Sequence, residues 1–237
     1  MLYGKGLRTL ALATAAMMTL AIGLVFFYAP VEADQGVIQK IFYIHVPMAI
    51  TALGGFIAGG IFAIQHLRTR DRKWDVRSYV AIHQSIILAM GTLITGSIWA
   101  RASWGHWWLW DEPVLVSFLV VFLLYCCYQP LRFSIEDSER QARYASVFAI
   151  TAGAFVPINF IAVRLAQQYT HPRVLSKTGG NLPGEMRLTF LVALAAMVLL
   201  FITLWRLELV SKNASDQLRK LRRRLEKKSE DKEAVMA

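Results

Sequence analysis

The chain has 237 residues, of which 56% are hydrophobic, and its formal net charge is +10. A mean hydropathy of +0.42 is too high for an ordinary soluble domain of this length and is typical of a polytopic membrane protein. The composition therefore excludes a water-soluble globular domain as the main body of the chain.

Six segments lack Asp, Glu, Lys and Arg and are long enough to cross a hydrocarbon core of about 30 Å. In lipid each segment must be helical, because an unpaired backbone amide there costs several kcal/mol. We predict an all-α membrane protein with six transmembrane helices, a transmembrane domain over residues 1–206 and a basic tail over 207–237. The predicted spans are residues 9–31, 41–65, 78–100, 113–131, 144–163 and 188–205. The fourth is the weakest, because its apolar character tapers at Tyr128-Gln129-Pro130.

The first apolar run has an alternative interpretation. Lys5 and Arg8 precede it and Val31-Glu32-Ala33 follows it, so the segment also resembles a signal peptide with a small-residue cleavage site. The run is longer than the 7–15 residues usual in a signal peptide. We therefore favour an uncleaved first helix.

The basic residues predict the orientation of the helices. Of the 26 Lys and Arg residues, 20 lie at the start of the chain, in segments 66–77 and 132–143, and in the tail from Arg206. The other six lie in the alternate loops, which is the positive-inside pattern. Both termini are predicted to be cytoplasmic. Because membrane topology and the basic tail account for the positive net charge, this charge is no argument for nucleic-acid binding.

The loop between the third and fourth spans reads Trp104-Gly105-His106-Trp107-Trp108-Leu109-Trp110-Asp111 and holds four of the seven tryptophans. An interfacial aromatic belt needs only scattered aromatic side chains at helix ends. Tryptophan also stacks on flat aromatic ligands, so the loop suggests a platform for a planar ligand such as haem.

The spacing within this loop predicts a short amphipathic helix. Trp104, Trp107 and Trp108 stand at i, i+3 and i+4 and would share one face. Trp110 and Asp111 would fall on another face. Asp111 either favours the start of the fourth helix through the helix dipole or orients a histidine or tryptophan N–H.

Three histidines map to the predicted outer side: His45, His106 and His171. Two histidines that approach from opposite sides can supply both axial ligands of a haem iron. An arginine such as Arg101 or Arg173 can pair with a haem propionate.

The remaining polar or reactive residues have simpler interpretations. His83, near the inner start of the third span, is predicted to bond to a neighbouring helix. Cys126 and Cys127 are predicted to be small buried side chains. The chain has no C-x-x-C-H sequence, so it does not itself carry covalently attached haem.

The tail has leucines at helical spacing, Leu218, Leu221 and Leu225, among many basic residues. Such a helix either lies on the anionic inner leaflet or docks a cytoplasmic partner. A solvated tail with some helix is an equally good interpretation.

The tryptophan loop resembles the tryptophan-rich WWD motif of haem-handling membrane proteins in cytochrome c maturation. Within that superfamily, the six-helix layout is similar to the haem exporter protein C (CcmC) family. Ile41-Phe-Tyr-Ile-His45-Val-Pro47 resembles the family's first histidine segment, and His171-Pro172 with Gly179-Gly180 resembles the second. The chain departs from the family pattern at His106, at Glu112-Pro113 after the motif, and before His171, where tryptophans are usual.

The resemblance implies a haem-delivering subunit of the bacterial inner membrane, not an enzyme, with its haem site on the periplasmic side. His45 and His171 would be the axial ligands of a transiently and non-covalently bound haem b, and the tryptophan loop its platform. His106 is a further candidate for the iron. The resemblance also implies two partners, a membrane-anchored haem chaperone and ABC transporter subunits that supply ATP-driven release. The chain itself has no P-loop sequence.

Two other functions stay open at this point. The haem-to-apocytochrome c ligases of the other maturation route share the tryptophan motif, although they are usually larger. A structural or transport subunit without haem would use the tryptophans only as a membrane anchor.

Overall fold

The computed structural model describes residues 6–165, 171 and 182–236. Among them, six helices are long and apolar enough to cross a membrane, which confirms the predicted fold class. The fourth predicted span corresponds to two helices, α4 and α5, that follow each other directly. The elements are α1 (Leu7–Phe27), the 3-10 helix η1 (Val37–Ile41), α2 (Phe42–Thr69), α3 (Arg72–Trp104), α4 (Pro113–Cys126), α5 (Tyr128–Phe133), α6 (Ser138–Leu165) and α7 (Gly184–Met236).

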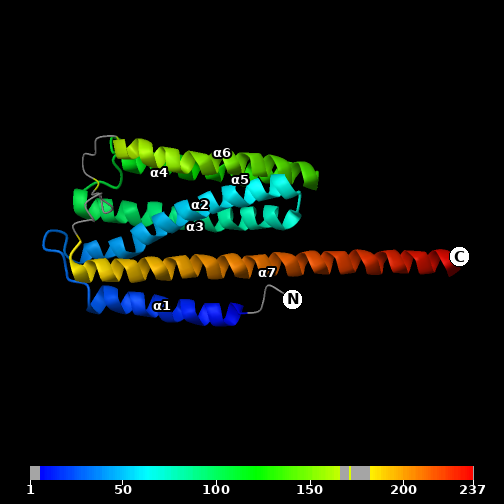
Figure 1. Cartoon of the computed structure of the whole chain (residues 1–237), viewed down its shortest axis with the longest axis horizontal. Coiled ribbons are helices and arrows are strands. Elements are labelled where there is room, and N and C mark those ends of the chain that lie inside the picture. The colour runs from blue at the N-terminus through cyan, green and yellow to red at the C-terminus, as the bar shows by residue number, and fades with distance from the viewer. Residues whose placement is uncertain (1–5, 166–170, 172–181, 237) are drawn as a thin grey trace.

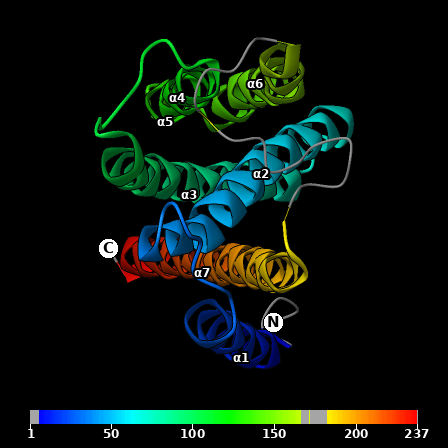
Figure 2. The same cartoon turned by 90° about the vertical axis from the view of Figure 1, so that its left-hand side faces the viewer.

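The helices stack in successive layers (Figures 1 and 2). α1 packs against α7, α7 against α2 and α3, and α2 against α3 and α6, with α4 and α5 beside α6 at the far edge. The start of α1 and the end of α7 lie on one side of the bundle, and the turn between α3 and α4 lies on the other (Figure 1). With both termini cytoplasmic, as the charge pattern predicts, this turn would face outward.

α2 lies at the centre of the bundle and approaches its neighbours closely. A Cβ atom at Gly60 would lie 3.1 Å from the carbonyl oxygen of Ala149 and 3.4 Å from the Cα of Gly153, both in α6. Membrane helices pack through such small residues, because their backbones can then touch. Phe56 of α2 stacks on Tyr125 of α4, with 3.7 Å between ring centroids. The core is therefore built around α2.

The fourth span is interrupted at Cys127, between α4 and α5. Pro130 has no backbone N–H, so the Cys126 carbonyl loses its usual i+4 donor. Arg132 in α5 binds both carboxylate oxygens of Asp75 in α3 at 2.7 Å, which fixes α5 against α3. The prediction that both cysteines are buried is wrong: Cys126 is partly exposed and Cys127 is exposed, because α4 lies at the edge of the bundle.

Several helices, among them α2, α3, α6 and α7, extend beyond their predicted spans, because the polar residues that flank the apolar runs also form helix. α3 begins at Arg72, where the Asp71 carboxylate accepts a hydrogen bond from the backbone N–H of Lys73 at 2.9 Å. The pKa of Asp71 is lowered, chiefly by its hydrogen bond with the Lys73 side chain. α7 runs without a break past residue 206 to Met236.

Candidate haem site

A cavity of about 240 Å³ lies at the end of the bundle where α3 ends and α4 begins. Side chains from α2, α3, α4, α6, the tryptophan loop and the segment before α7 line it, and most of them are apolar. Five of the residues predicted from the sequence are among its lining: His45, Trp104, Trp107, Trp108 and His171. The fold thus brings together two histidines that are far apart in the chain.

The tryptophan loop is not a helix, so the predicted amphipathic helix over Trp104, Trp107 and Trp108 is wrong. α3 ends at Trp104 because Gly105 adopts the left-handed conformation, with φ at 78°. A glycine in this position commonly ends a helix, since it has no Cβ to clash. The Arg101 guanidinium donates to the Gly105 carbonyl and closes the end of α3. The three tryptophans nevertheless line one cavity, Trp104 from the end of α3 and Trp107 and Trp108 from the irregular loop.

Aromatic packing holds the first tryptophan of the loop in place. Trp104 meets Trp99 of α3 edge to face, with 4.8 Å between ring centroids. On another side its ring lies 6.2 Å from that of His171, again edge to face. Trp99 in turn donates from its indole nitrogen to the side chain of Gln35 at 3.3 Å. The wall of the cavity beside His171 is therefore a connected aromatic cluster.

His45 enters the cavity from the first turns of α2, and its Nδ1 atom lies 3.1 Å from the Thr95 hydroxyl oxygen in α3. That hydroxyl has one proton, and it donates to the Gly91 carbonyl at 2.8 Å. With its proton engaged there, the Thr95 oxygen would accept from Nδ1–H of His45. We infer that the Nε2 lone pair is left free, which is the form of histidine that binds a metal.

Gly96, one turn from Thr92 on α3, provides the space for the His45 ring. A Cβ atom at Gly96 would lie 2.8 Å from Cε1 and 3.4 Å from Nδ1 of His45. Such a contact is shorter than van der Waals packing allows, so even alanine here would displace the imidazole. The position of the His45 ring thus depends on the absence of a side chain at Gly96 in the neighbouring helix α3.

His171 is held through its backbone. The carboxylate of Glu112 accepts a hydrogen bond from the His171 N–H, with 3.2 Å between Oε2 and N. Glu112 is only 1% exposed and is the N-cap residue of α4, directly before Pro113. One buried carboxylate therefore joins the start of α4 to the segment that carries the second histidine.

The cavity wall also contains polar groups that suit a ligand with acceptor atoms. Trp108 Nε1 is buried and has no hydrogen-bond partner within the part of the chain that the structure describes. Asn159 of α6 adds an amide to a wall that is mostly apolar. A buried N–H without a partner is costly, so an acceptor on a bound molecule would stabilise this site. The described residues contain no group of three or more His, Cys, Asp or Glu side chains that could hold a bare metal ion.

Several predicted site residues do not line the cavity. His106, Asp111 and Trp110 are exposed on the loop, and Arg101 is exposed and engaged with Gly105. Arg173 lies outside the described residues.

Sequence reasoning missed four residues that build this site: Thr95, Gly96, Glu112 and Asn159. The lining residues Thr92, Gly96 and Trp99 recur at steps of four and three along α3. That helical periodicity was the available signal for the α3 face.

The heme exporter protein C family model matches residues 1–225. The chain belongs to the heme exporter protein C family. The heme exporter protein C of Rhodobacter capsulatus is 32% identical over 159 residues, which cover 66% of this chain and 65% of the relative. That of Bradyrhizobium diazoefficiens is 33% identical over 198 residues, or 81% and 74% of the two chains. A ccmC-like mitochondrial protein of Marchantia polymorpha, named for cytochrome c biosynthesis, is 29% identical over 184 residues, or 78% of each.

These matches confirm the resemblance drawn from the tryptophan loop and the histidine segments. Together with the six apolar helices, they make this member of the heme exporter protein C family a multi-pass membrane protein.

Proposed function

We propose that this protein binds haem between His45 and His171 and presents it at the outer face of the bacterial inner membrane. From there haem would pass to a membrane-anchored haem chaperone during assembly of c-type cytochromes. The observation that carries the proposal is the meeting of the two histidines in one tryptophan-walled cavity. Family membership supports haem as the ligand.

The chemistry of the donors fits a bis-histidine haem. In a bis-histidine haem each histidine gives the iron one axial nitrogen, and the porphyrin ring needs apolar surface. The inferred tautomer of His45 leaves Nε2 available, and the lining supplies the apolar surface. The indole N–H of Trp108 is a donor for an acceptor group of the ligand. Binding by side chains alone, without a C-x-x-C-H sequence, would leave the haem b releasable.

The rim of the cavity suits transfer to another protein. Trp107 lines the cavity while 60% of its surface is exposed, and Trp110 on the same loop is 74% exposed. Exposed aromatic side chains are frequent anchors of protein–protein contacts. We expect the haem chaperone to receive haem at this rim. Any ATP-driven step would come from ABC transporter subunits, since this chain has no P-loop sequence.

The test is haem binding by the purified protein in detergent, followed by its visible spectrum and quantified as the pyridine haemochrome. Wild type should bind stoichiometric haem with a six-coordinate spectrum. His45→Ala and His171→Ala should each lose or alter it. His106→Ala is the matched control, because His106 is exposed and outside the cavity lining, and it should bind as wild type does.

Haem retained by the double variant His45→Ala, His171→Ala would overturn the ligand assignment. Attachment of haem to a C-x-x-C-H peptide by this chain alone would instead indicate the ligase function.

A further inference from the structure

The last part of α7 stands clear of the rest of the protein (Figure 1). Among the residues of α7 up to Glu226, Leu209 is the last that is buried. Every residue from 217 to 226 is exposed. At about 1.5 Å per residue, the helix from Lys212 to Met236 is roughly 36 Å long. Lys212 still reaches α3, with its Nζ 4.4 Å from the centre of the Tyr79 ring, and the exposed residues 217–226 lie beyond that contact.

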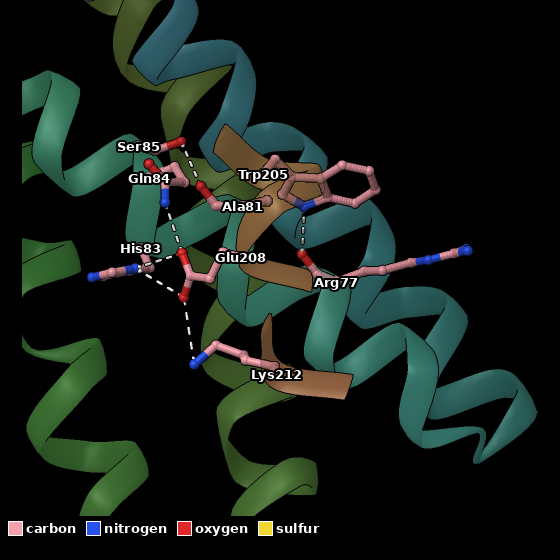
Figure 3. Close-up of polar contacts among 8 residues, drawn as sticks. All are labelled: Arg77, Ala81, His83, Gln84, Ser85, Trp205, Glu208 and Lys212. Atoms are coloured by element: carbon pink, nitrogen blue, oxygen red, sulfur yellow. Dashed lines mark hydrogen bonds and ion pairs between the residues drawn. The ribbon is translucent and has the colours of Figure 1, made fainter. Parts of the chain in front are cut away.

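Polar contacts fix α7 to α3 at the place where α7 leaves the bundle (Figure 3). The Glu208 carboxylate lies 3.0 Å from Nδ1 of His83 and accepts from the Gln84 amide at 2.7 Å. Lys212 Nζ lies 3.4 Å from the same carboxylate. Trp205 donates to the Arg77 carbonyl at 3.2 Å. The prediction that His83 bonds to a neighbouring helix is confirmed.

This anchoring sets the direction of the extension. Because α7 continues as one unbroken helix through the anchored residues, its extension runs along the axis of its own membrane span. A helix in that direction points away from the bilayer. The arrangement disfavours the interpretation in which the tail lies flat on the inner leaflet.

The extension carries three exposed leucines, Leu218, Leu221 and Leu225, which we call the leucine stripe. Their exposed fractions are 67%, 54% and 60%. The spacing i, i+3, i+7 puts all three on one face of the helix. In the heptad repeat of a coiled coil, written abcdefg, this is the spacing of the a and d positions, against which a second helix packs. Apolar side chains that stand in water away from the lipid mark a surface for a protein partner.

Basic side chains flank the leucine stripe. Residues 217–226 contain five Lys or Arg and a single Glu. If the leucines occupy a and d positions, Arg222 and Arg224 fall at the e and g positions. Charged side chains at these positions form ion pairs with the partner helix and so determine which helix binds. A second copy of this chain would bring the two basic clusters together. Charge complementarity therefore favours an acidic partner.

We propose that the leucine stripe docks an acidic amphipathic helix of another protein, on the side of the bundle opposite the haem cavity. Positive-inside topology predicts that this side is cytoplasmic. The partner helix would place leucine-like side chains against the stripe and glutamates or aspartates beside Arg222 and Arg224. The bundle itself, with its anchored α7, would hold the docking helix upright.

The probe is a synthetic helix of four heptads with leucine at a and d and glutamate at e and g, labelled for fluorescence anisotropy. The receptor is the full-length protein in nanodiscs. The acidic peptide should bind, and the same peptide with lysine at e and g should not. Leu218→Gln, Leu221→Gln and Leu225→Gln combined should weaken binding by about tenfold or more, while glutamine keeps the helix.

A charge-matched pair of variants tests the flanking arginines. Arg222→Glu with Arg224→Glu should also weaken binding about tenfold, because both reverse charges beside the stripe. Lys220→Glu with Arg223→Glu makes the same charge change on the opposite face and should leave binding within about twofold. Haem binding should be unchanged in every variant, which shows that the bundle is intact.

Three results would overturn the proposal. Acidic-peptide binding that is absent, or that survives the leucine substitutions, would remove the docking surface. Leucine-dependent binding to vesicles of anionic lipid without peptide binding would assign the stripe to a membrane. Leucine-dependent self-association would assign it to a second copy.

Discussion

The buried carboxylate of Glu112 accepts a hydrogen bond from the backbone N–H of His171, with 3.2 Å between Oε2 and N. The two residues are far apart in the sequence and come from different elements. Glu112 directly follows the tryptophan loop and is the N-cap residue of α4, so this contact ties the end of the loop to the second histidine. Moving either one would therefore disturb the other.

Replacing Glu112 separates this positioning role from charge. Glu112→Gln keeps an oxygen that accepts from the His171 N–H, whereas Glu112→Ala leaves that N–H without its acceptor. We expect Glu112→Ala to weaken haem binding by about tenfold and to shift the visible spectrum from six-coordinate toward five-coordinate haem. Glu112→Gln should keep the six-coordinate spectrum. A wild-type spectrum and affinity in Glu112→Ala would show that His171 needs no such anchor.

Thr95→Val removes the acceptor for His45 Nδ1–H while it keeps the shape of the side chain. Partners of this kind typically contribute about 10–100-fold to metal affinity, because they set the tautomer and the ring orientation of the ligand. We expect a loss of haem affinity in that range, measured by titration of the purified protein. Thr151→Val is the control, because Thr151 is exposed on α6 and its hydroxyl donates to the Val147 carbonyl of the same helix. An equal loss in both variants would point to a general effect on the bundle.

The sequence predicted the six spans well because uncharged apolar runs of this length have one stable form in lipid. The periodicity of Trp104, Trp107 and Trp108 led to a wrong helix, because spacing alone does not show that Gly105 adopts a positive φ. The carboxylate of Glu112 was also beyond sequence reasoning. Its role depends on a tertiary contact with a distant segment, and no local sequence pattern predicts such a contact.

Other features were visible in part. The break at Cys127 follows from Pro130, and the sequence shows it in part, because the apolar character of the fourth span tapers at Tyr128-Gln129-Pro130. The contact of His45 with Thr95 depends on how α2 crosses α3, which hydrophobic patterning does not specify. Sequence reasoning thus found the ligands proposed for haem but not the groups that orient them.

Gly96→Ala tests whether the space beside His45 is required. The added methyl would lie 2.8 Å from Cε1 of His45, so the imidazole must shift or rotate. We expect weaker haem binding, by about tenfold or more, with little change in the unfolding of the apoprotein. Gly54→Ala is the matched control, because a Cβ there meets nothing within 4 Å. Full haem binding by Gly96→Ala would mean that the His45 imidazole can bind the haem from a different orientation.

The ion pair between Arg132 and Asp75 is expected to stabilise the fold without affecting haem binding directly. Both charges are almost completely buried and meet at 2.7 Å, and the Arg132 guanidinium also donates to the Tyr128 hydroxyl at 3.3 Å. Removing one partner leaves a buried charge without its counterion, so Asp75→Asn should cost about 3–5 kcal/mol in the free energy of unfolding. Denaturation by a strong detergent, followed by tryptophan fluorescence, measures this cost.

A double-mutant cycle then shows whether the cost comes from the unpaired charge. Asp75→Asn with Arg132→Met should lose less stability than Asp75→Asn alone, because no charge remains buried. The exposed pair of Arg143 and Glu139, at 3.2 Å in α6, is the control, and Glu139→Gln should change stability by no more than about 1 kcal/mol. If Asp75→Asn behaves like Glu139→Gln, the attachment of α5 to α3 rests on apolar packing instead of this ion pair.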